Sequence, residues 1–342
     1  MQYVDELMGL ETNFDIIHRV IRLGDTDACM YLIDGFCKDE LMQKILQYLM
    51  DLKAEDFPKD AHEMSKIAIP YVEVDLDDTW EKILGALLSG VFVLLLDGYE
   101  KAVLIDARTY PARGVEEPDK DKVLRGSKDG FVETVVFNTA LIRRRIRSTD
   151  LHMEMLNAGE NSRTDIVLCY MESRVDPKLL TQIRERIRSI QVDALAMNQE
   201  SLAECLYQRK WYNPFPKFKY TERPDTAAAQ VLEGNLVILV DNSPSAMILP
   251  TTIFDVVEEA DDYYFPPVTG TYLRLTRFLI ALLTYFVTPT YLLLMNHRMW
   301  IPENLEFIIL KEDPNVPLIL QFLLLELAID GLRLAAVNTP IC

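Results

Sequence analysis

Basic residues are in short supply in this 342-residue chain, which has 35 Lys and Arg against 53 Asp and Glu. The resulting net charge of −18 repels a phosphate backbone, which excludes nucleic acid as a main partner. Apolar residues make up 49% of the chain and charged residues 26%, a composition that excludes a disordered or low-complexity protein. The sequence therefore predicts a folded, acidic protein that is long enough for more than one core.

Cysteine and histidine are also scarce and widely spaced. The five cysteines include no C-x-x-C pair, and their odd number favours reduced, mostly buried thiols over a disulfide framework. The four histidines show no metal-ligand spacing with the cysteines, so we predict no metal site and no cofactor. Glycine-rich phosphate loops and the G-x-S-x-G elbow are missing, and the acidic N-terminus lacks the apolar core of a signal peptide.

One short motif suggests an enzyme. Asp75, Asp77 and Thr79 have the D-x-D-x-T spacing of the nucleophile loop in haloacid-dehalogenase-type phosphatases, where one Asp attacks phosphorus and the other moves protons. Such enzymes also need an acidic pair for Mg²⁺ near another strand, and the only later Asp pair, Asp261-Asp262, lies close to an apolar stretch. We therefore predict no catalytic residue and keep a Mg²⁺-dependent phosphatase as the enzymatic alternative.

Charge is sparse in the C-terminal part of the chain. Of the 65 residues from Phe278 to Cys342, nine are charged, whereas the 277 residues before them include 79 charged residues. The stretch Phe278–Asn296 runs for 19 residues without a charge, close to the roughly 20 that span a bilayer. We predict a spanning helix over about 275–297, in which Pro289 is tolerated. The alternative is a long buried helix of a soluble domain.

A second apolar stretch covers about 316–337 and carries Glu326, Asp330 and Arg333. Spacings of four and three place these residues on one helical face. If the segment spans the bilayer, this charged stripe must face a partner or water. If the segment lies in the membrane interface, the stripe is its wet face, and both interpretations stay open. In a pore, Glu326 and Asp330 would be the groups that attract cations.

The charged part of the chain contains an internal duplication. Residues 26–52 match residues 164–190 at an offset of 138, and each copy predicts a strand followed by an amphipathic helix. Residues 90–105 match residues 234–249 at an offset of 144, and each copy predicts a β-hairpin. The expected fold class is therefore α/β, with two related α/β subdomains followed by C-terminal transmembrane or interfacial helices.

Particular turn and cap residues support this alignment. Asp97-Gly98 and Asp241-Asn242 supply the hairpin turns, since Asn as well as Gly tolerates a positive φ. Apolar runs before both turns predict strands that are buried on both faces. Asp78-Thr79 and Asp225-Thr226 are matched to each other, and each is expected to begin a short helix.

A connecting helix is predicted over Phe131–Arg147, which ends in Arg143, Arg144, Arg145 and Arg147. Cations suit the C-terminus of a helix, and contact with anionic lipid or an acidic neighbour is the alternative explanation. The predicted domains are a first subdomain at 1–114, a connecting segment and helix at 115–150, a second subdomain at 151–266, and a membrane region at 267–342.

Three stretches together carry a family likeness. Val115–Arg147 contains a Glu-Glu-Pro, an Arg-Gly, a Gly-Phe-x-Glu, an Asn and a Leu-Ile-Arg-Arg-Arg pattern. Asn213–Pro250 contains Thr-Glu-Arg-Pro-Asp followed by the second hairpin, and Asp262-Tyr263-Tyr264 precedes the first apolar span. The chain resembles the GerA-type A-subunit family of spore germinant receptors over essentially its whole length, and within that family the stage V sporulation branch.

This resemblance implies a membrane protein of spore germination, located in the spore inner membrane with its N-terminal domain facing the spore core or cytoplasm. It implies an oligomer that passes ions in the germinant response and works with other membrane subunits of germination complexes. A non-conducting membrane scaffold for receptor subunits is the alternative function. Because family members continue through further spanning helices, we expect the membrane region to be truncated at Cys342.

The same family pattern indicates where subunits or domains meet. We expect polar residues between 113 and 145 to form subunit or interdomain contacts, because their pattern exceeds what a solvated helix needs. These residues are Arg113, Glu116, Glu117, Arg125, Glu133, Asn138, Arg143, Arg144 and Arg145. The alternative is that they only fix the two halves of the chain to each other.

Overall fold

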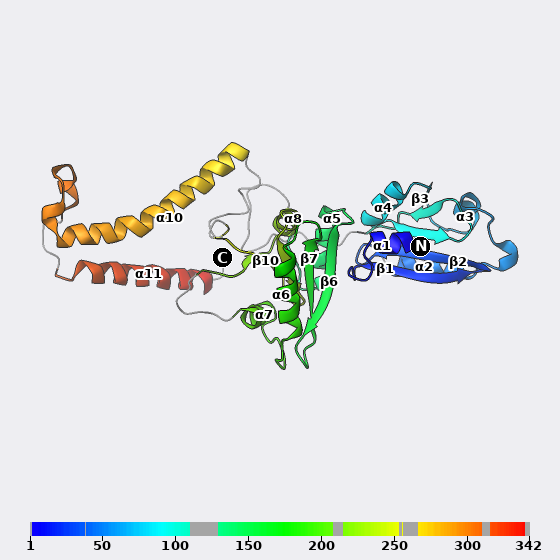
Figure 1. Cartoon of the computed structure of the whole chain (residues 1–342), viewed down its shortest axis with the longest axis horizontal. Helices are drawn as coiled ribbons and strands as arrows, with labels where there is room; N and C mark the ends of the chain where they lie inside the picture. Colours follow the sequence, from blue (N-terminus) through cyan, green and yellow to red (C-terminus); the bar gives the residue numbers. More distant parts are fainter. Residues whose placement is uncertain are drawn as a thin grey trace. The chain divides into compact units, whose positions relative to one another are not determined.

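The computed structural model describes residues 2–37, 39–109, 129–207, 215–252, 255, 266–309 and 315–338. The chain divides into two compact units, Met1–Tyr264 and Phe265–Cys342. We call the first the sheet unit, because it contains two five-stranded sheets, and the second the helical unit (Figure 1).

The first half of the sheet unit builds one antiparallel sheet with the strand order β1-β2-β4-β5-β3. Its elements are α1 (Gln2–Leu7), β1 (Ile16–Leu23), β2 (Thr26–Ile33), α2 (Asp39–Met50), the 3-10 turn η1 (Ala54–Asp56), α3 (Ala61–Ile67), β3 (Val74–Asp77), α4 (Trp80–Leu88), β4 (Phe92–Leu96) and β5 (Ala102–Ile105).

The second half repeats this plan, with the strand order β6-β7-β9-β10-β8 and antiparallel pairs throughout. Its elements are α5 (Val135–Arg145), β6 (Leu151–Ala158), β7 (Thr164–Met171), α6 (Pro177–Arg188), α7 (Gln199–Leu206), β8 (Lys219–Thr221), α8 (Pro224–Leu232), β9 (Leu236–Val240) and β10 (Ala246–Leu249).

The element bounds confirm the predicted duplication and the α/β fold class. The first residue of β7 lies at the predicted offset from that of β2, and the same offset relates α6 to α2. The larger offset that was predicted for the hairpins relates β9 to β4 and β10 to β5. The helix α5 precedes β6 as α1 precedes β1, so the predicted connecting helix also serves as the first helix of the second repeat.

One predicted correspondence is wrong by three residues. The helices α4 and α8 begin directly after Thr79 and Arg223, at the same offset as the two hairpins. Thr79 is therefore equivalent to Arg223 and not to Thr226. The physical reason is Pro224, whose fixed φ suits the first helical position and starts α8 there, so Asp225 lies inside the first turn.

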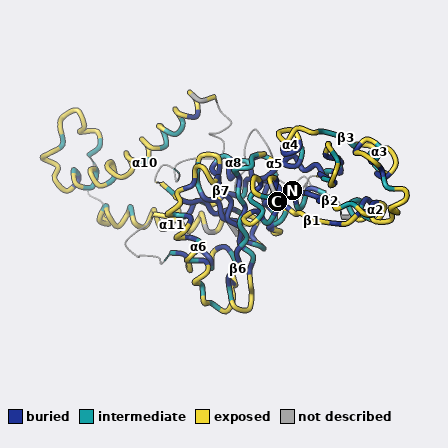
Figure 2. The backbone as a smooth tube through the Cα atoms, turned by 45° about the vertical axis from the view of Figure 1, so that its right-hand side comes forward, coloured by how far each residue is buried: buried dark blue, intermediate teal, exposed yellow. Residues whose placement is uncertain are grey.

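Helices cover both faces of each sheet. In the first half, α2 and α3 pack on one face, in a core that includes Ile45 and Met64, and α1 and α4 pack on the other, with Val4 and Leu87. In the second half, α6 and α7 cover one face and α5 and α8 the other. The central strands β4 and β9 are buried as predicted, because helices lie on both sides of antiparallel sheets. Figure 2 shows the interior of the sheet unit in dark blue, as buried.

The hairpin turns adopt the conformation that their residues predict. Gly98 has a φ of +80° and Asn242 a φ of +59°. Asn is one of the few residues besides glycine that enter this left-handed region readily. The second hairpin, which has Asn242 where the first has Gly98, therefore keeps the same turn.

A second pair of equivalent positions requires glycine for space as well as conformation. Gly90 and Gly234 have φ values of +93° and +99°. A Cβ at Gly90 would lie 2.4 Å from Cδ2 of Phe36, and a Cβ at Gly234 would lie 2.9 Å from the backbone oxygen of Arg174. Both glycines allow a helix to end closely against the loop that follows the second strand of its repeat.

The helical unit contains two long helices, and the Tyr291 ring of the first lies 6.2 Å from the Phe322 ring of the second. Its elements are α10 (Pro267–Asn296), the 3-10 turns η3 (Arg298–Trp300) and η4 (Glu303–Ile308), and α11 (Leu318–Asn338). The helix α10 begins eight residues before the predicted span and continues through Pro289. Figure 1 shows α10 bent, as expected where a proline removes a helical hydrogen bond.

Candidate functional site: a buried polar junction in the sheet unit

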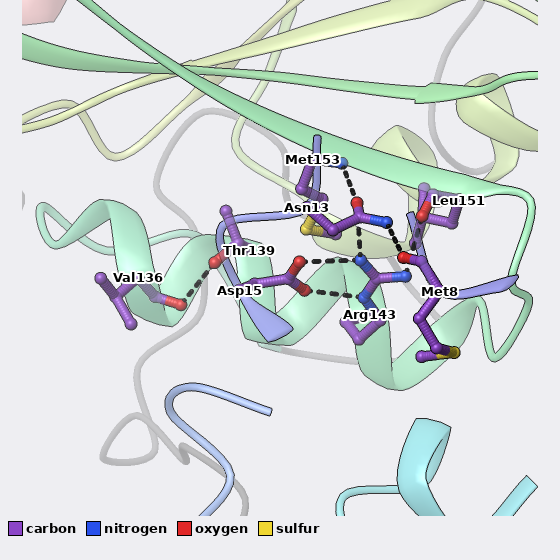
Figure 3. A network of polar contacts seen from close by, with 8 residues as sticks. All are labelled: Met8, Asn13, Asp15, Val136, Thr139, Arg143, Leu151 and Met153. Carbon is purple, nitrogen blue, oxygen red and sulfur yellow. Dashed lines mark hydrogen bonds and ion pairs between the residues drawn. The ribbon is translucent and has the colours of Figure 1, made fainter. Parts of the chain in front are cut away.

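Arg143 on α5 is completely buried, which an arginine tolerates only with a partner. Its Nε lies 2.7 Å from Oδ2 of Asp15 and its Nη2 lies 2.9 Å from Oδ1, so the pair is bidentate (Figure 3). The Asp15 side chain is itself only 1% exposed. A third donor, Nη1, bonds the carbonyl oxygen of Leu151 at 3.0 Å. The charge is therefore compensated and several of its donors are used, as a buried ion pair requires.

Asn13 extends this network to the edge strand β6. Its Oδ1 accepts a hydrogen bond from the Met153 backbone N–H at 2.7 Å, and its Nδ2 donates to the Met8 carbonyl at 2.8 Å (Figure 3). The backbone N–H of Phe14 donates to the Met153 carbonyl at 3.2 Å. The segment 13–14 thus covers part of the outer side of β6, which would otherwise be an open edge. We call Asn13, Asp15, Arg143, Leu151 and Met153 the polar junction.

His152 lies beside the polar junction. Its Nδ1 is 2.8 Å from Oγ1 of Thr12, and its ring stacks on Tyr170 with the centroids 5.7 Å apart. Burial lowers the pKa of His152, since the charged ring loses water; Glu172 opposes this shift and Arg143 adds to it. The neutral imidazole is therefore favoured next to the positive charge of Arg143.

The hairpin of the second repeat holds the start of α5. Oδ1 of Asp241 accepts a hydrogen bond from the Val135 N–H at 3.1 Å, and the Asn242 N–H donates to the Glu133 carbonyl at 2.7 Å. The Asn138 amide bonds both the N–H and the carbonyl of Val132, at 2.8 and 2.6 Å. These bonds fix where α5 begins, and therefore where Arg143 projects.

The helix α5 also touches the first half of the unit. Ala140 shares a small buried cluster with Ile33 and Phe36. A Cβ at Gly35 would lie 3.4 Å from the Cβ of Ala140. The hydroxyl of Thr139, one turn from Arg143, is satisfied within the helix by the Val136 carbonyl at 2.8 Å (Figure 3). One helix thus packs on the second sheet and contacts the first repeat.

The predicted contact residues fall into different places. Arg143 is buried in the polar junction, whereas Glu133 and Arg144 are exposed. Arg145 is half-buried, with Nη1 bonding the Leu141 carbonyl at 2.9 Å and Nη2 lying 2.5 Å from Asp129. Four predicted residues lie outside the described part of the chain: Arg113, Glu116, Glu117 and Arg125. Contact between subunits through any of these residues stays a prediction.

Sequence reasoning missed Asn13 and Asp15, because they precede the first recognised repeat. A signal was nevertheless present. The Asp34 N–H donates to the Asp15 carbonyl at 2.8 Å, and the Glu172 N–H donates to the Asp150 carbonyl at 2.9 Å. Asp15 and Asp150 are therefore equivalent residues of the two repeats, at an offset of 135. The loop between β6 and β7 is three residues longer than the loop between β1 and β2, so the offset of 138 aligns Asp15 with Met153 and hides this equivalence.

The Asp75 and Asp77 pair does not form the geometry of a phosphatase site. Both residues lie on β3, a four-residue edge strand of an antiparallel sheet, and Asp75 is exposed. Oδ1 of Asp77 accepts from the Thr79 N–H at 2.9 Å, and Oδ2 lies 3.1 Å from Nζ of Lys82. These bonds lower the pKa of Asp77, and they assign the residue to the start of α4.

The helical unit exposes both apolar and charged side chains. Val268–Asn296 is 29 residues long; its most apolar 18-residue stretch has a mean hydropathy of 1.9, and none of that stretch is buried. By length and composition it is the one helix of the described chain that is suited to cross a membrane. Glu326, Asp330 and Arg333 are all exposed on α11. Among the described residues, no group of three His, Cys, Asp or Glu side chains is placed to hold a metal ion.

Comparison with known proteins gives a consistent result over the whole chain. The family model of the Bacillus/Clostridium GerA spore germination protein matches residues 2–341. Stage V sporulation protein AF of Bacillus subtilis (strain 168) is 38% identical over 341 residues, which cover 99% of this chain and 69% of that protein. Spore germination protein A1 of the same strain is 30% identical over 337 residues, covering 98% of this chain and 69% of that protein.

Two further similarities extend this result. The uncharacterized membrane protein YfkQ of Bacillus subtilis (strain 168) is 30% identical over 334 residues, covering 95% of this chain and 64% of that protein. A crystal structure of the N-terminal domain of the A subunit of the Bacillus megaterium spore germinant receptor GerK3 aligns with a TM-score of 0.56 and 27% identity. That alignment covers 74% of this chain and 93% of the crystallised chain.

Proposed function

The chain belongs to the GerA family of Bacillus/Clostridium spore germination proteins, and from this premise we propose that it is a membrane-anchored subunit of an oligomeric complex that passes ions during germination. Family membership supports a role in spore germination. In the proposal, the sheet unit assembles the complex and transmits the germination signal, and no catalysis is involved. Other membrane subunits of germination complexes are its expected partners.

The anchoring helix is the observation that carries the proposal. At 1.5 Å per residue, the 29 residues of Val268–Asn296 extend about 44 Å, which exceeds the roughly 30 Å of bilayer hydrocarbon. Large apolar side chains along it, such as Tyr285 and Phe286, are exposed at 77% and 64%. A lipid environment would bury these side chains. Arg274 and Arg277 precede the uncharged stretch, which favours a cytoplasmic location for the sheet unit, facing the spore core.

The charged stripe of α11 is the proposed ion-contacting element. Glu326 and Asp330 lie one helical turn apart and are both exposed, with Arg333 three residues further on. Carboxylates within a membrane domain are costly unless they face water or a partner. In an oligomer, copies of α11 around a central axis would present a ring of carboxylates that attracts cations.

The polar junction supports the role of the sheet unit as one rigid body. A bidentate ion pair without solvent access joins Asp15 and Arg143, residues that lie 128 positions apart. Packing of α5 on both repeats adds to this connection. A body held together in this way can transmit a displacement at one end to the other without bending between the repeats.

The test is potassium release from spores after a nutrient pulse, measured with the complete gene, its deletion and a Glu326→Gln/Asp330→Asn variant. We expect deletion to slow release and the double neutralisation to slow it as well. A Glu303→Gln/Glu306→Gln variant makes the same charge change outside α11, in η4, and is the matched control. Unchanged release on deletion would contradict an ion-release function.

The alternative is a scaffold that binds other subunits without conducting ions. The exposure of the α11 stripe is the observation that favours it, because the same carboxylates can pair with cationic side chains of a neighbouring subunit. Under this alternative, deletion still slows potassium release. The Glu326→Gln/Asp330→Asn variant co-purifies with less partner subunit, but each complex that does assemble releases potassium at the normal rate.

A further inference from the structure

We propose that the sheet unit self-associates head to tail, with the edge strand β1 of one copy beside the edge strand β3 of the next copy. The inference rests on the proposed function, which has the chain act as an oligomer, and it identifies the partner of these two edges as a second copy of the chain. It is carried by the open edges of the first sheet and by the distribution of charge between them.

The outer side of β1 is open among the described residues. Its eight residues pair with β2 on the inner side, and β1 stands at one end of the sheet order. The Asp34 N–H donates to the Asp15 carbonyl, so the backbone groups of Asp15 point toward β2. Backbone groups alternate in direction along a strand, so those of every second residue after Asp15 also point toward β2. The backbone groups of His18, Val20 and Arg22 consequently face outward. Figure 2 shows most of β1 as exposed.

The second repeat shows how such an edge is used in this fold. The strand β6 is equivalent to β1, and Met153 occupies the position of His18. Met153 is completely buried, and the segment 13–14 bonds both its N–H and its carbonyl. At the equivalent place on β1, His18 is exposed, and so are Ile17 and Val20 on either side of it, at 39% and 59%. A non-helical segment therefore bonds this edge in one repeat, through the Asn13 side chain and the Phe14 backbone, and no described segment bonds the equivalent edge in the other repeat.

The side chains of β1 give this edge a basic character in an acidic protein. His18 lies opposite Tyr31, and Arg22 lies opposite Asp27, so both lie on the face that α1 and α4 cover. Arg19 lies opposite Met30, on the face that α2 and α3 cover. The strand has no acidic residue, and Arg22 forms no ion pair within the described residues.

The opposite edge has the complementary charge on the same face. Asp75 pairs with Leu104 and Asp77 with Ala102, residues of the core under α1 and α4. Glu73 and Asp75 are exposed, and Asp75 forms no ion pair with any described residue. The Asp106 N–H bonds the Glu73 carbonyl, so by alternation the backbone groups of Val74 and Leu76 face outward.

Charge and direction together select one arrangement. Two β1 edges repel each other, as do two β3 edges, whereas β1 and β3 attract, and this disfavours a symmetric dimer through either edge. Alternating antiparallel pairs make β1 and β3 of one sheet run in the same direction. A head-to-tail contact that keeps each sheet face on the same side therefore pairs β1 with β3 in parallel. Carboxylates of Glu73 and Asp75 then meet His18 and Arg22. Such a heterologous contact repeats from copy to copy, and it forms a ring when the rotation between copies closes.

The experiment uses the full chain, purified in detergent, and follows self-association by sedimentation over a concentration series at low and high salt. Arg22→Glu and Asp75→Arg each place like charges across the contact. We expect each to raise the concentration at half-assembly by about tenfold. The double variant Arg22→Glu/Asp75→Arg exchanges the charges and is expected to restore assembly to within about threefold of the unmodified chain. Lys178→Glu, an exposed reversal at the start of α6, is the matched control.

Each outcome decides the proposal. Weakening by both single variants, rescue by the double variant and no effect of Lys178→Glu would support it. Association that neither reversal changes, or a double variant no better than the single ones, would place the contact elsewhere and overturn the inference while leaving an oligomer in place. A chain that stays monomeric at every concentration would overturn the oligomeric function too. If a charge reversal lowers the far-UV circular dichroism signal, the neutral variants Arg22→Gln and Asp75→Asn are used in its place. Added salt must then weaken self-association of the unmodified chain more than it weakens self-association of these neutral variants.

Discussion

Replacing Asp15 with Asn is expected to destabilise the sheet unit by about 3–5 kcal/mol. The substitution keeps the side-chain volume but removes the negative charge, so Arg143 is left as a buried cation. Neither side chain has solvent access that would let water replace the lost partner, since their exposures are 1% and 0%. The new asparagine side chain keeps one oxygen that can accept a hydrogen bond from Nε or Nη2 of Arg143. Its NH₂ group is a donor, so it faces the other guanidinium donor without forming a hydrogen bond.

A double variant separates the ion pair from its surroundings. In Asp15→Leu/Arg143→Met no buried charge remains. The hydrogen bond to the Leu151 carbonyl is lost, and so is the 3.4 Å bond from Nη2 to Oδ1 of Asn13, which still accepts from the Met153 N–H. Leaving the buried Leu151 carbonyl unpaired costs about 1–3 kcal/mol. The double variant is therefore expected to be more stable than Asp15→Asn. A double-mutant cycle should give a coupling of a few kcal/mol between the two positions.

The assay is thermal unfolding of the full chain in detergent, followed by circular dichroism. For a unit of this size, 3–5 kcal/mol corresponds to a fall in Tm of about 6–20 °C. Arg188→Gln is the matched control, because Arg188 is 67% exposed and lies 3.7 Å from its partner Glu154. That surface pair should contribute at most about 1 kcal/mol. A loss of only about 1 kcal/mol in Asp15→Asn, or losses that simply add in the double variant, would refute the reasoning, since the pair would then behave as a hydrated surface contact.

Three further predictions concern single residues. Gly90→Ala should lower stability by at least about 2 kcal/mol, because its Cβ would lie 2.4 Å from Phe36 at a φ of +93°; Gly85→Ala, which meets nothing within 4 Å in α4, should be neutral or stabilising in the same thermal assay. His152 has a lowered pKa, so its contribution is fully present above its unfolded pKa of about 6.5 and is lost as pH falls through its folded pKa; His152→Gln should reduce the fall in Tm between pH 7 and 5. The pKa of Asp77 is also lowered, so its stabilisation of α4 is present above about pH 4 and is lost on acidification; Asp77→Asn should make hydrogen exchange in α4 less dependent on pH, and an unchanged dependence would contradict the assignment.

The repeated architecture was predictable because its signals are local. A strand followed by an amphipathic helix, and a hairpin with Asp-Gly or Asp-Asn at its turn, leave periodic patterns that survive after the two copies diverge. The patterns also gave the burial of β4 and β9 on both faces. Periodicity does not report strand direction, so it could not show that antiparallel sheets achieve this burial.

The candidate site was predictable only in part, because its members lie far apart in sequence. Arg143 was singled out through its neighbours in the arginine run, and its position at the end of a helix offered an explanation that required no partner. The structure shows instead that Arg143 is buried against Asp15. No local pattern connects residues so distant in the chain, and within one sequence only the equivalence of Asp15 and Asp150 could have drawn attention to the acidic partner.

The dual role of α5 was hidden for a related reason. Its apolar positions do not form a single stripe, because Ala140 contacts the first repeat while Ile142 packs against the second sheet. A helix with two apolar contacts looks like a connector in sequence. Packing shows that it is also the first element of the second repeat.

The Asp15–Arg143 pair also sets an order for synthesis of the chain. When Asp15 leaves the ribosome, its partner has not yet been made, and the 128 positions that separate them take about 6–25 s at ordinary elongation rates. Until then Asp15 must stay hydrated and segment 13–14 has no β6 to bind. The contacts of residues 13–15 therefore form only after α5 and β6 of the second repeat have been synthesised, and the two repeats complete their folding together.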